Sequence, residues 1–270
     1  MTPRRSALAY YDEEFLDSDE ARPIRILAEY LRPLRAFCDQ GVRDTVVFFG
    51  SARAHPGGPL GRYVHEATEL ARLITEWSLS LPDPGNRLVV CSGGGPGIME
   101  AANRGAALAG GRSVGLNIGL PHEQRPNPYI TKELSFEFHY FFMRKLWFAY
   151  LARAMVVFPG GFGTFDELFE ILTLAQTRKL EGSIPVLLYG SSYWQEVINF
   201  DAMVRHGVIA AEDLNLFSLV DDPRAALELL KTRVVLGPEP QTPLPFLAKS
   251  RHPRDADGGG SASGGTPGNR

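Results

Sequence analysis

The sequence predicts an α/β protein built on a doubly wound parallel sheet, and three observations point to that class. Short apolar runs, typical of buried strands, alternate with longer segments of helical periodicity between residues 45 and 235. Two of these runs pass directly into a glycine-rich turn that opens a helix. Hydrophobic residues make up 44% of the 270-residue chain, which is ample for one buried core. Right-handed crossover connections follow from this class.

Three segments are expected along the chain. A single α/β domain occupies residues 45–235. Residues 1–44 are expected to form an N-terminal helical extension, with a helix over 23–40 that Pro33 should kink or split. Residues 236–270 are rich in Pro, Gly and Ser, which predicts a disordered C-terminal tail.

The elements of the domain follow from the periodicity of the apolar residues. Strands are expected over residues 45–49, 88–91, 113–118, 134–140, 155–158, 184–189 and 216–220. Helices are expected over residues 61–79, 98–109, 143–152, 194–205 and 223–231, and a further helix should open at Thr164.

Composition and charge exclude several classes of function. The formal net charge of −3 argues against broad binding to nucleic acid or to a membrane surface. Two cysteines, Cys38 and Cys91, cannot build a disulfide framework, and both fall in apolar patterns, so we expect core thiols. No apolar run is long enough to span a membrane, and no apolar segment follows the N-terminus as in a signal peptide. The six histidines lack the spacing of metal ligands. We therefore expect a soluble, cytoplasmic protein without a metal site.

The stretch from Val156 to Leu168 combines a strand, a turn with three glycines and the start of a helix. Such a turn presents free backbone N–H groups at the positive end of a helix, which suits a phosphate or another anion. Two acids, Asp166 and Glu167, stand in the first helical turn, and Glu170 follows one turn later. A pure phosphate cradle has no need of acids there, so the pattern favours a site that holds an anion and does chemistry beside it.

A structural alternative exists for Glu167. The segment from Thr164 to Glu167 also fits a capping box, in which Thr164 is the N-cap and Glu167 bonds back to its N–H group. Acids in a first helical turn are ordinary in any case. Spacing alone leaves both interpretations open.

A second glycine-rich turn, from Ser92 to Gly97, also joins a strand to a helix. Its glycine spacing fits neither the dinucleotide-binding fingerprint nor a P-loop. Because ligands gather beyond the carboxyl ends of parallel strands, both turns are expected to form one pocket. The first strand ends at the same edge, which makes Ser51 and Arg53 candidate contacts, with a solvated loop arginine as the alternative for Arg53. A proline-rich loop over 120–129 is expected to cross the surface and to cover the site.

Together these motifs resemble the Lonely Guy family, phosphoribohydrolases that act on nucleoside 5′-monophosphates and were once labelled lysine decarboxylases. The family hallmark, Pro-Gly-Gly-x-Gly-Thr-x-x-Glu, is matched from Pro159 to Glu167, and its upstream Arg-Lys pair is matched by Arg144 and Lys145. The segment from Gly93 to Met99 resembles the family's other glycine loop. The extra N-terminal helix makes the chain look more like the larger bacterial branch of the family.

The resemblance implies a Rossmann-like domain that hydrolyses an N-glycosidic bond without a cofactor and releases a free base and ribose 5-phosphate. It implies that Arg144 and Glu167 are catalytic, with Asp166 and Glu170 in supporting roles. A nucleoside 5′-monophosphate is the implied partner, and a homodimer is the implied assembly. The implied substrate-binding residues are Ser51, Ser92, Gly93, Gly94, Gly95, Gly97, Met99, Lys145, Pro159, Gly160, Gly161, Gly163 and Thr164.

The chemistry agrees with these residue types. Cleaving a glycosidic bond builds positive charge on the sugar ring, which a fixed carboxylate such as Glu167 stabilises, or it positions the attacking water. Hydrogen bonds from the glycine turn to the 5′-phosphate would orient the reacting bond. Three roles are open for Arg144: pairing with the phosphate, orienting Glu167, or assisting the leaving base.

One departure from the family pattern concerns the substrate. Plant-type, cytokinin-activating members have Glu before the Arg-Lys pair, whereas this chain has Met143. AMP or another purine or pyrimidine monophosphate is therefore at least as good a candidate as a cytokinin nucleotide. The sequence does not give the preferred base.

Two other functions compete with hydrolysis. A binding protein resembling the molybdenum cofactor carriers would hold a phosphorylated ligand without turning it over, but it would not need to pair Arg144 with Glu167. Amino-acid decarboxylation needs pyridoxal phosphate on a lysine, and neither Lys145 nor Lys179 has that context. Five aromatic residues could supply a dimer interface or belong to the core: Phe141, Phe142, Trp147, Phe148 and Tyr150.

Overall fold

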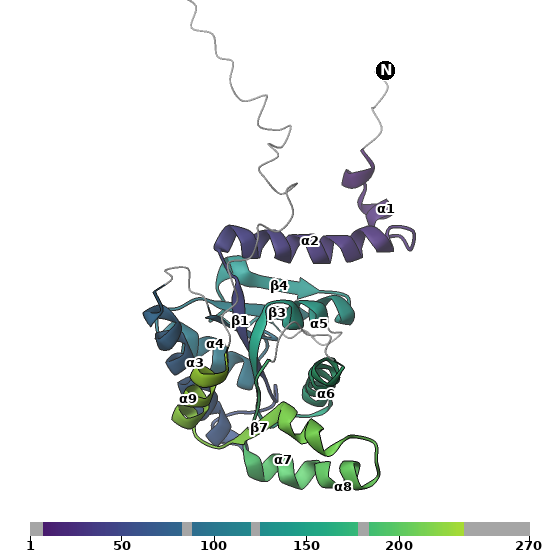
Figure 1. Ribbon diagram of the computed structural model, residues 1–270. Helices are drawn as coiled ribbons and strands as arrows, with labels where there is room; N and C mark the ends of the chain where they lie inside the picture. The colour runs from purple at the N-terminus through teal and green to yellow at the C-terminus, as the bar shows by residue number, and fades with distance from the viewer. Residues whose placement is uncertain (1–7, 83–87, 120–124, 178–183, 235–270) are drawn as a thin grey trace, which may run out of the picture. The chain divides into compact units, whose positions relative to one another are not determined.

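The computed structural model of the chain describes residues 8–82, 88–119, 125–177 and 184–234 (Figure 1). Within these ranges seven strands form one sheet in the order β4-β3-β2-β1-β5-β6-β7, and each neighbouring pair is parallel. The strands are β1 (Asp44–Phe49), β2 (Leu88–Ser92), β3 (Ser113–Ile118), β4 (Ser135–Phe138), β5 (Ala152–Val157), β6 (Val186–Tyr189) and β7 (Phe217–Val220). The predicted doubly wound parallel sheet is confirmed.

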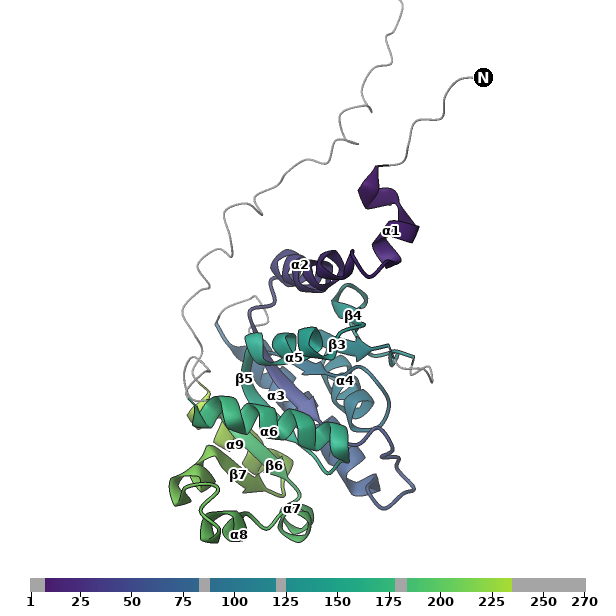
Figure 2. The ribbon, with the colours of Figure 1, turned by 90° about the vertical axis from the view of Figure 1, so that its right-hand side faces the viewer.

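Helices cover both faces of the sheet (Figure 2). On one face lie α3 (Gly61–Ser80), α4 (Ile98–Leu108) and α9 (Pro223–Arg233). On the other face lie α5 (Phe141–Tyr150) and α6 (Phe162–Gln176). The remaining helices are α1 (Glu13–Asp17), α2 (Arg22–Gln40), α7 (Ser191–Val197), α8 (Phe200–Arg205) and the short 3-10 segments η1 (Ala9–Tyr11), η2 (Lys132–Leu134) and η3 (Ala211–Leu216).

The central strands β1, β2 and β5 are buried on both faces, as expected for a parallel sheet between two helical layers. In β1, Val46 and Phe48 join the apolar cluster that includes α3, α4 and α9. Phe49 has the opposite orientation and packs edge-on against Phe148 of α5, with ring centroids 4.8 Å apart. The central strand thus joins the two layers by the alternation of its side chains.

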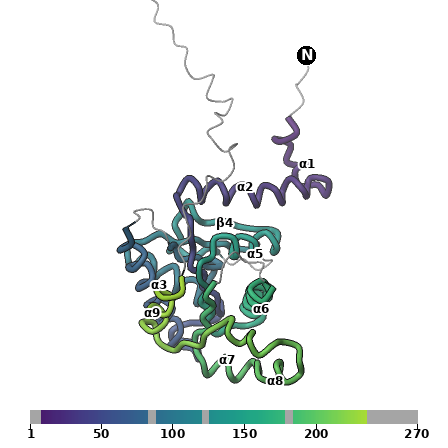
Figure 3. Tube along the Cα trace, viewed as in Figure 1, coloured from purple at the N-terminus to yellow at the C-terminus, as the bar shows by residue number. Residues whose placement is uncertain are grey.

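Pro33 was expected to kink or split the N-terminal helix, and the split was wrong. Pro33 lies inside α2, whose Cα trace runs without a break (Figure 3). Proline lacks the N–H group that would bond to the carbonyl of Glu29, four residues earlier. That carbonyl accepts a hydrogen bond of 3.1 Å from Nε1 of Trp147 in α5 instead, so the helix continues without an unsatisfied group there.

Three other predictions are corrected in detail. Residues 194–205 form two helices instead of one, because Asn199 interrupts them and caps α8 by accepting a hydrogen bond from the N–H of Ala202 at 2.8 Å. The strand expected over 134–140 is shorter, because Leu134 ends the 3-10 turn η2. Cys38 is exposed rather than buried, because α2 turns Leu34 and Phe37 toward the core; Cys91 is buried as expected.

The predicted tail over 236–270 and the first half of the loop over 120–129 lie outside the described residues. Within the part of the chain that the structure describes, no helix combines the length and the apolar character that crossing a membrane would require.

Candidate active site

Three turns meet at the carboxyl ends of β1, β2 and β5. The strand order reverses direction between β1 and β5, and such a switch point is where ligands bind in open α/β sheets. Ser51, just after β1, connects the other two turns through its backbone. Its N–H donates to the carbonyl of Pro159 at 3.0 Å, and its carbonyl accepts from the N–H of Ile98 at 3.1 Å. The two glycine-rich segments predicted to form one pocket therefore lie on either side of one residue.

Glycine is required at Gly97 for this contact. Gly97 has a φ of 70°, in the left-handed region, and a Cβ atom there would lie 2.3 Å from the Ser51 carbonyl oxygen. Any side chain at this position would push the two turns apart.

A buried polar network supports the Ser92–Gly97 turn from below. The hydroxyl of Ser92 donates to Oδ1 of Asn103 at 2.7 Å and accepts from the N–H of Gly94 at 3.1 Å. Asn127 closes the network: its backbone N–H donates to the Gly94 carbonyl at 2.8 Å, and its Nδ2 donates to Oδ1 of Asn103 at 2.9 Å. Ser92 therefore shapes the turn, and its own side chain is buried.

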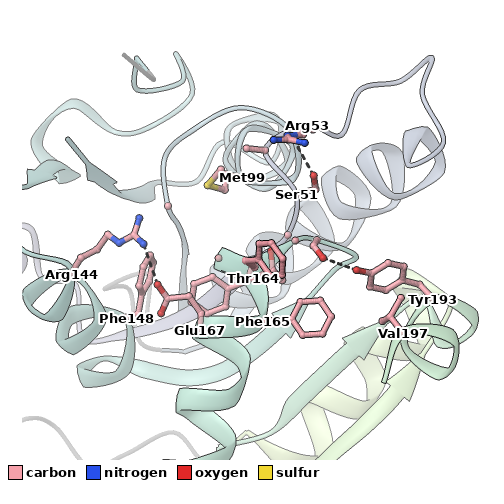
Figure 4. A pocket seen from close by; sticks show the side chains of 18 residues that line it. Ser51, Arg53, Met99, Arg144, Phe148, Thr164, Phe165, Glu167, Tyr193 and Val197 are labelled. Atoms are coloured by element: carbon pink, nitrogen blue, oxygen red, sulfur yellow. Dashed lines mark hydrogen bonds and ion pairs between the residues drawn. The ribbon is translucent and has the colours of Figure 1, made fainter. Parts of the chain in front are cut away.

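The three turns and the helices α4, α5, α6 and α7 line a cleft of about 940 Å³ (Figure 4). Its polar and glycine lining residues are Gly50, Ser51, Arg53, Gly93, Arg144, Gly160, Gly161, Gly163, Thr164, Glu167 and Tyr193. Its apolar lining residues are Phe49, Ala52, Met99, Phe148, Phe162, Phe165 and Val197. A cleft of this size, largely apolar with a few convergent polar groups, is typical of a small-molecule site.

The start of α6 presents unused hydrogen-bond donors to this cleft. Gly161 is the N-cap, and as a glycine it has no side chain to make a capping hydrogen bond. The first bond within the helix runs from the N–H of Phe165 to the carbonyl of Gly161 at 3.1 Å, so the N–H groups of Phe162, Gly163 and Thr164 precede the helical ladder. All three residues line the cleft. This arrangement suits an anion.

The capping-box alternative for Glu167 was wrong. The helix begins at Phe162, two residues earlier than expected, so Thr164 is its third residue and cannot be the N-cap. Instead, Oε1 of Glu167 pairs with Nη2 of Arg144 at 3.2 Å, across the space between α6 and α5 (Figure 4).

The Arg144–Glu167 pair is sheltered from water. The side chains of Arg144 and Glu167 are only 14% and 7% exposed, and the guanidinium also lies over the rings of Phe141 and Phe148. Burial raises the pKa of Glu167 to about 7, although the positive charge of Arg144 opposes the shift. Burial also lowers the pKa of Arg144, which the Glu167 carboxylate counteracts, and an arginine in this setting keeps its charge. A carboxyl group that titrates near neutrality is suited to acid–base work.

Lys145, next in the chain, faces a different partner. Its Nζ lies 2.8 Å from Oδ1 of Asp166 and 2.9 Å from Oε2 of Glu170, in a neighbouring groove outside the cleft. These ion pairs hold α5 against α6 on the side away from Glu167. The structure therefore places Asp166 and Glu170 beside the predicted catalytic pair, and it separates Lys145 from the cleft.

The structure brings most of the predicted site residues together. Those that line the cleft are Ser51, Gly93, Met99, Arg144, Gly160, Gly161, Gly163, Thr164 and Glu167. Those that do not line it are Ser92, Gly94, Gly95, Gly97, Lys145 and Pro159. Apart from Lys145, the residues of the second group belong to the turns themselves and support their shape.

Several cleft residues were missed from the sequence. Tyr193 of α7 lines the cleft, and its hydroxyl donates to the carbonyl of Gly160 at 2.6 Å, which fixes the glycine turn. Asn127 does not line the cleft, but its amide supports the Ser92–Gly97 turn from the loop after β3. Neither residue has a spacing relative to the motifs that could have revealed it. Phe148 and Val197 follow ordinary apolar patterns.

Among the residues described, no group of three or more His, Cys, Asp or Glu side chains is placed to hold a metal ion.

Comparisons with known proteins agree with the motifs. A family model described as "Possible lysine decarboxylase" matches residues 99–230, which include Arg144, the Gly160–Thr164 turn and Glu167. The chain is 29% identical over 184 residues to the rice (Oryza sativa subsp. japonica) protein named "Probable cytokinin riboside 5'-monophosphate phosphoribohydrolase LOG4", covering 67% of this chain and 73% of the relative. It is 28% identical over 195 residues to the rice protein named "Cytokinin riboside 5'-monophosphate phosphoribohydrolase LOG", covering 70% and 72%. The X-ray structure of a structural-genomics target, TM1055, shares the fold with a TM-score of 0.50 at 21% identity, covering 70% of this chain and 99% of that chain.

Proposed function

We propose that this chain is a phosphoribohydrolase of the Lonely Guy family, which hydrolyses the N-glycosidic bond of a nucleoside 5′-monophosphate and releases the free base and ribose 5-phosphate. The observation that supports this most directly is the sheltered ion pair of Arg144 and Glu167 beside the free N–H groups of α6. The N-terminus of α6 suits an anion, the same helix carries an acid that titrates near neutrality, and α5 supplies the arginine that pairs with this acid.

In the proposed reaction, the N–H groups of Phe162, Gly163 and Thr164 bind the 5′-phosphate, which fixes the ribose in the cleft. As the bond to the base breaks, positive charge develops on the ribose ring. The ionised Glu167 stabilises that charge and receives a proton from the attacking water, whose oxygen bonds to the ribose. The base departs with the electron pair of the broken bond and takes up one proton from solvent, and Glu167 returns its proton to solvent. Arg144 holds the carboxylate in place through the 3.2 Å contact.

We further propose AMP, or another purine or pyrimidine monophosphate, as the substrate, with a cytokinin riboside monophosphate as an equal candidate because the relatives are named for it. The apolar lining residues of the cleft, among them Phe148, Phe165 and Val197, offer contact area to a base of either kind. None of these side chains selects one base by hydrogen bonding.

A homodimer is also proposed. Of the five aromatic residues considered for an interface, Trp147 and Phe148 are buried core residues. Phe141, Phe142 and Tyr150 of α5 are each at least half exposed, which leaves an apolar face on this helix.

The test is base release from AMP, followed by chromatography, with Glu167→Gln as the disabled variant. Asp166→Asn is a matched control, because Asp166 is the neighbouring acid, is largely exposed and pairs with Lys145 outside the cleft. We expect adenine and ribose 5-phosphate from wild type and from Asp166→Asn, and a loss of at least about a hundredfold in rate for Glu167→Gln. A panel of monophosphates then gives the base preference.

The contrary result is equally clear. If no monophosphate in the panel releases a base, while AMP still raises the melting temperature, the chain is a binding protein of the carrier type. Hydrolysis that persists in Glu167→Gln would remove the catalytic role from Glu167.

A further inference from the structure

We propose that Arg53 is the cation that recognises the phosphate group in the cleft, and that it sets the preference for phosphorylated over unphosphorylated ribosides. The inference rests on the proposed function, because it concerns the ligand of the same cleft. It gives the turn after β1, which contains Ser51 and Arg53, the role of supplying a full positive charge, which neither glycine turn supplies.

The first observation that supports a role for Arg53 is the distribution of charge in the cleft. Three charged side chains line it: Arg53, Arg144 and Glu167. When Glu167 is ionised, as the proposed reaction requires, it and Arg144 neutralise one another at 3.2 Å. Within the described residues, the guanidinium of Arg53 has no ion pair and no side-chain hydrogen bond. The unbalanced charge of the cleft is therefore the positive charge of Arg53, in a chain whose net charge is negative.

The second step is the way in which the fold presents Arg53. Its backbone N–H donates to the hydroxyl of Ser51 at 3.1 Å, within a turn that starts where β1 ends. Ser51 is held on one side by Pro159 and on the other by Ile98 through backbone hydrogen bonds. Arg53 is exposed, as a solvated loop arginine would be, but its backbone is tied to the fixed Ser51 and its side chain lines the cleft.

The third step is proximity to the helix start. A Cβ atom on Gly160 would lie 3.0 Å from the backbone nitrogen of Ser51 and 2.1 Å from Oγ1 of Thr164. The turn that bears Arg53 therefore packs directly against the glycine turn that opens α6. The N–H groups of α6 and the Arg53 side chain approach the same cleft from adjoining segments (Figure 4).

The chemistry of a phosphate monoester matches this pair of donors. Near neutral pH it carries between one and two negative charges and three acceptor oxygens. Backbone N–H groups supply hydrogen bonds and a partial positive charge, whereas a guanidinium supplies a full charge and two parallel N–H donors. Removing the guanidinium should thus weaken the binding of phosphorylated ligands and leave unphosphorylated ones unaffected.

The experiment compares wild type with Arg53→Gln and Arg53→Lys. Arg35→Gln is the matched control, because Arg35 is an exposed arginine of α2 that pairs with Asp39. Calorimetry measures the binding of ribose 5-phosphate and of ribose, and kinetics measure kcat and KM for AMP and the rate with adenosine. Melting temperatures show that each variant is folded.

We expect Arg53→Gln to bind ribose 5-phosphate about tenfold or more weakly, with a matching rise in KM for AMP and little change in kcat. Arg53→Lys should recover part of the affinity, since it keeps the charge but loses the bidentate geometry. Affinity should fall with added salt more steeply in wild type than in Arg53→Gln. The rate with adenosine and the properties of Arg35→Gln should match wild type.

Each outcome bears on one proposal or the other. If Arg53→Gln binds ribose 5-phosphate as tightly as wild type, the inference is wrong, whether or not AMP is hydrolysed. If no nucleotide is hydrolysed while ribose 5-phosphate binding still depends on Arg53, the inference stands and the proposed hydrolysis is wrong. If wild type binds ribose and ribose 5-phosphate equally, the cleft does not recognise phosphate and the inference is again overturned.

Discussion

Nη2 of Arg144 lies 3.2 Å from Oε1 of Glu167, and this contact joins α5 to α6 in a place that is largely closed to water. Taking two charges out of water is costly, so such a pair adds little to stability, whereas removing one partner leaves the other uncompensated. We infer that the pair is kept for the chemistry of the cleft.

The first prediction concerns the pH dependence of stability. Burial raises the pKa of Glu167 from 4.5 to about 7, so between these values the folded protein holds a proton that the unfolded chain has released. The contribution of Glu167 to stability is therefore greatest below about pH 4.5 and is lost as the pH rises through 7. In Glu167→Gln this loss is absent.

Denaturant unfolding of wild type and Glu167→Gln at pH 5, 6, 7 and 8 checks this prediction. The free energy of unfolding of the variant minus that of wild type should increase as the pH rises, by a total on the order of 3 kcal/mol. A difference that stays constant over this range would show that Glu167 titrates normally.

The second prediction separates the adjacent cations of α5. Arg144→Ala should lower kcat/KM for AMP by about a hundredfold or more, because Glu167 loses the group that positions it. Lys145→Ala should lower it by only a few-fold, because its ion pairs with Asp166 and Glu170 lie outside the cleft. Steady-state kinetics of both variants give the comparison, and equal losses would mean that Lys145 reaches the substrate.

The third prediction tests the buried network beneath the Ser92–Gly97 turn. Ser92→Ala removes the donor to Asn103 and the acceptor for the N–H of Gly94. We expect a loss of about 1–3 kcal/mol in the free energy of unfolding, since the buried N–H of Gly94 is left without that partner. Ser80→Ala is the control, because the Ser80 hydroxyl bonds to the carbonyl of Trp77 at an exposed position. Similar small losses in both variants would argue against the network.

The fourth prediction concerns Tyr193. Tyr193→Phe keeps the ring that packs against Trp194, at 5.0 Å between centroids, and removes the hydrogen bond to the carbonyl of Gly160. The glycine turn should hold the phosphate less firmly, so KM for AMP should rise several-fold while the melting temperature falls only slightly. An unchanged KM would show that the turn keeps its shape without this bond.

The order of strands and helices could be predicted because it depends on local apolar periodicity. Because β1 pairs with both β2 and β5, and all three strands are parallel, their carboxyl ends lie side by side. Ser51 and both glycine turns follow these ends, so they meet at one edge of the sheet. The segment from Val156 to Leu168 has the predicted order of strand, turn and helix.

What the sequence did not predict depends on contacts between distant segments. The Trp147 side chain satisfies the carbonyl that Pro33 leaves free, and no local rule connects those residues. The helix α6 begins at Phe162, before Thr164, so Glu167 is not in the capping position that its spacing with Thr164 suggested, and it pairs with Arg144 of α5. Tyr193 and Asn127 reach the glycine turns from elements that carry no motif.

The place of β1 between β2 and β5 has a consequence for the order of folding. Phe49 pairs with Val157, far later in the chain, whereas β2 is made soon after β1. During synthesis, the edge of β1 that pairs with β5 therefore remains unpaired and apolar until β5 has been made. A nascent chain that stalls before β5 would expose that edge to other chains, so we expect the yield of soluble protein to depend on chaperones or on growth temperature more than the stability of the finished sheet would suggest.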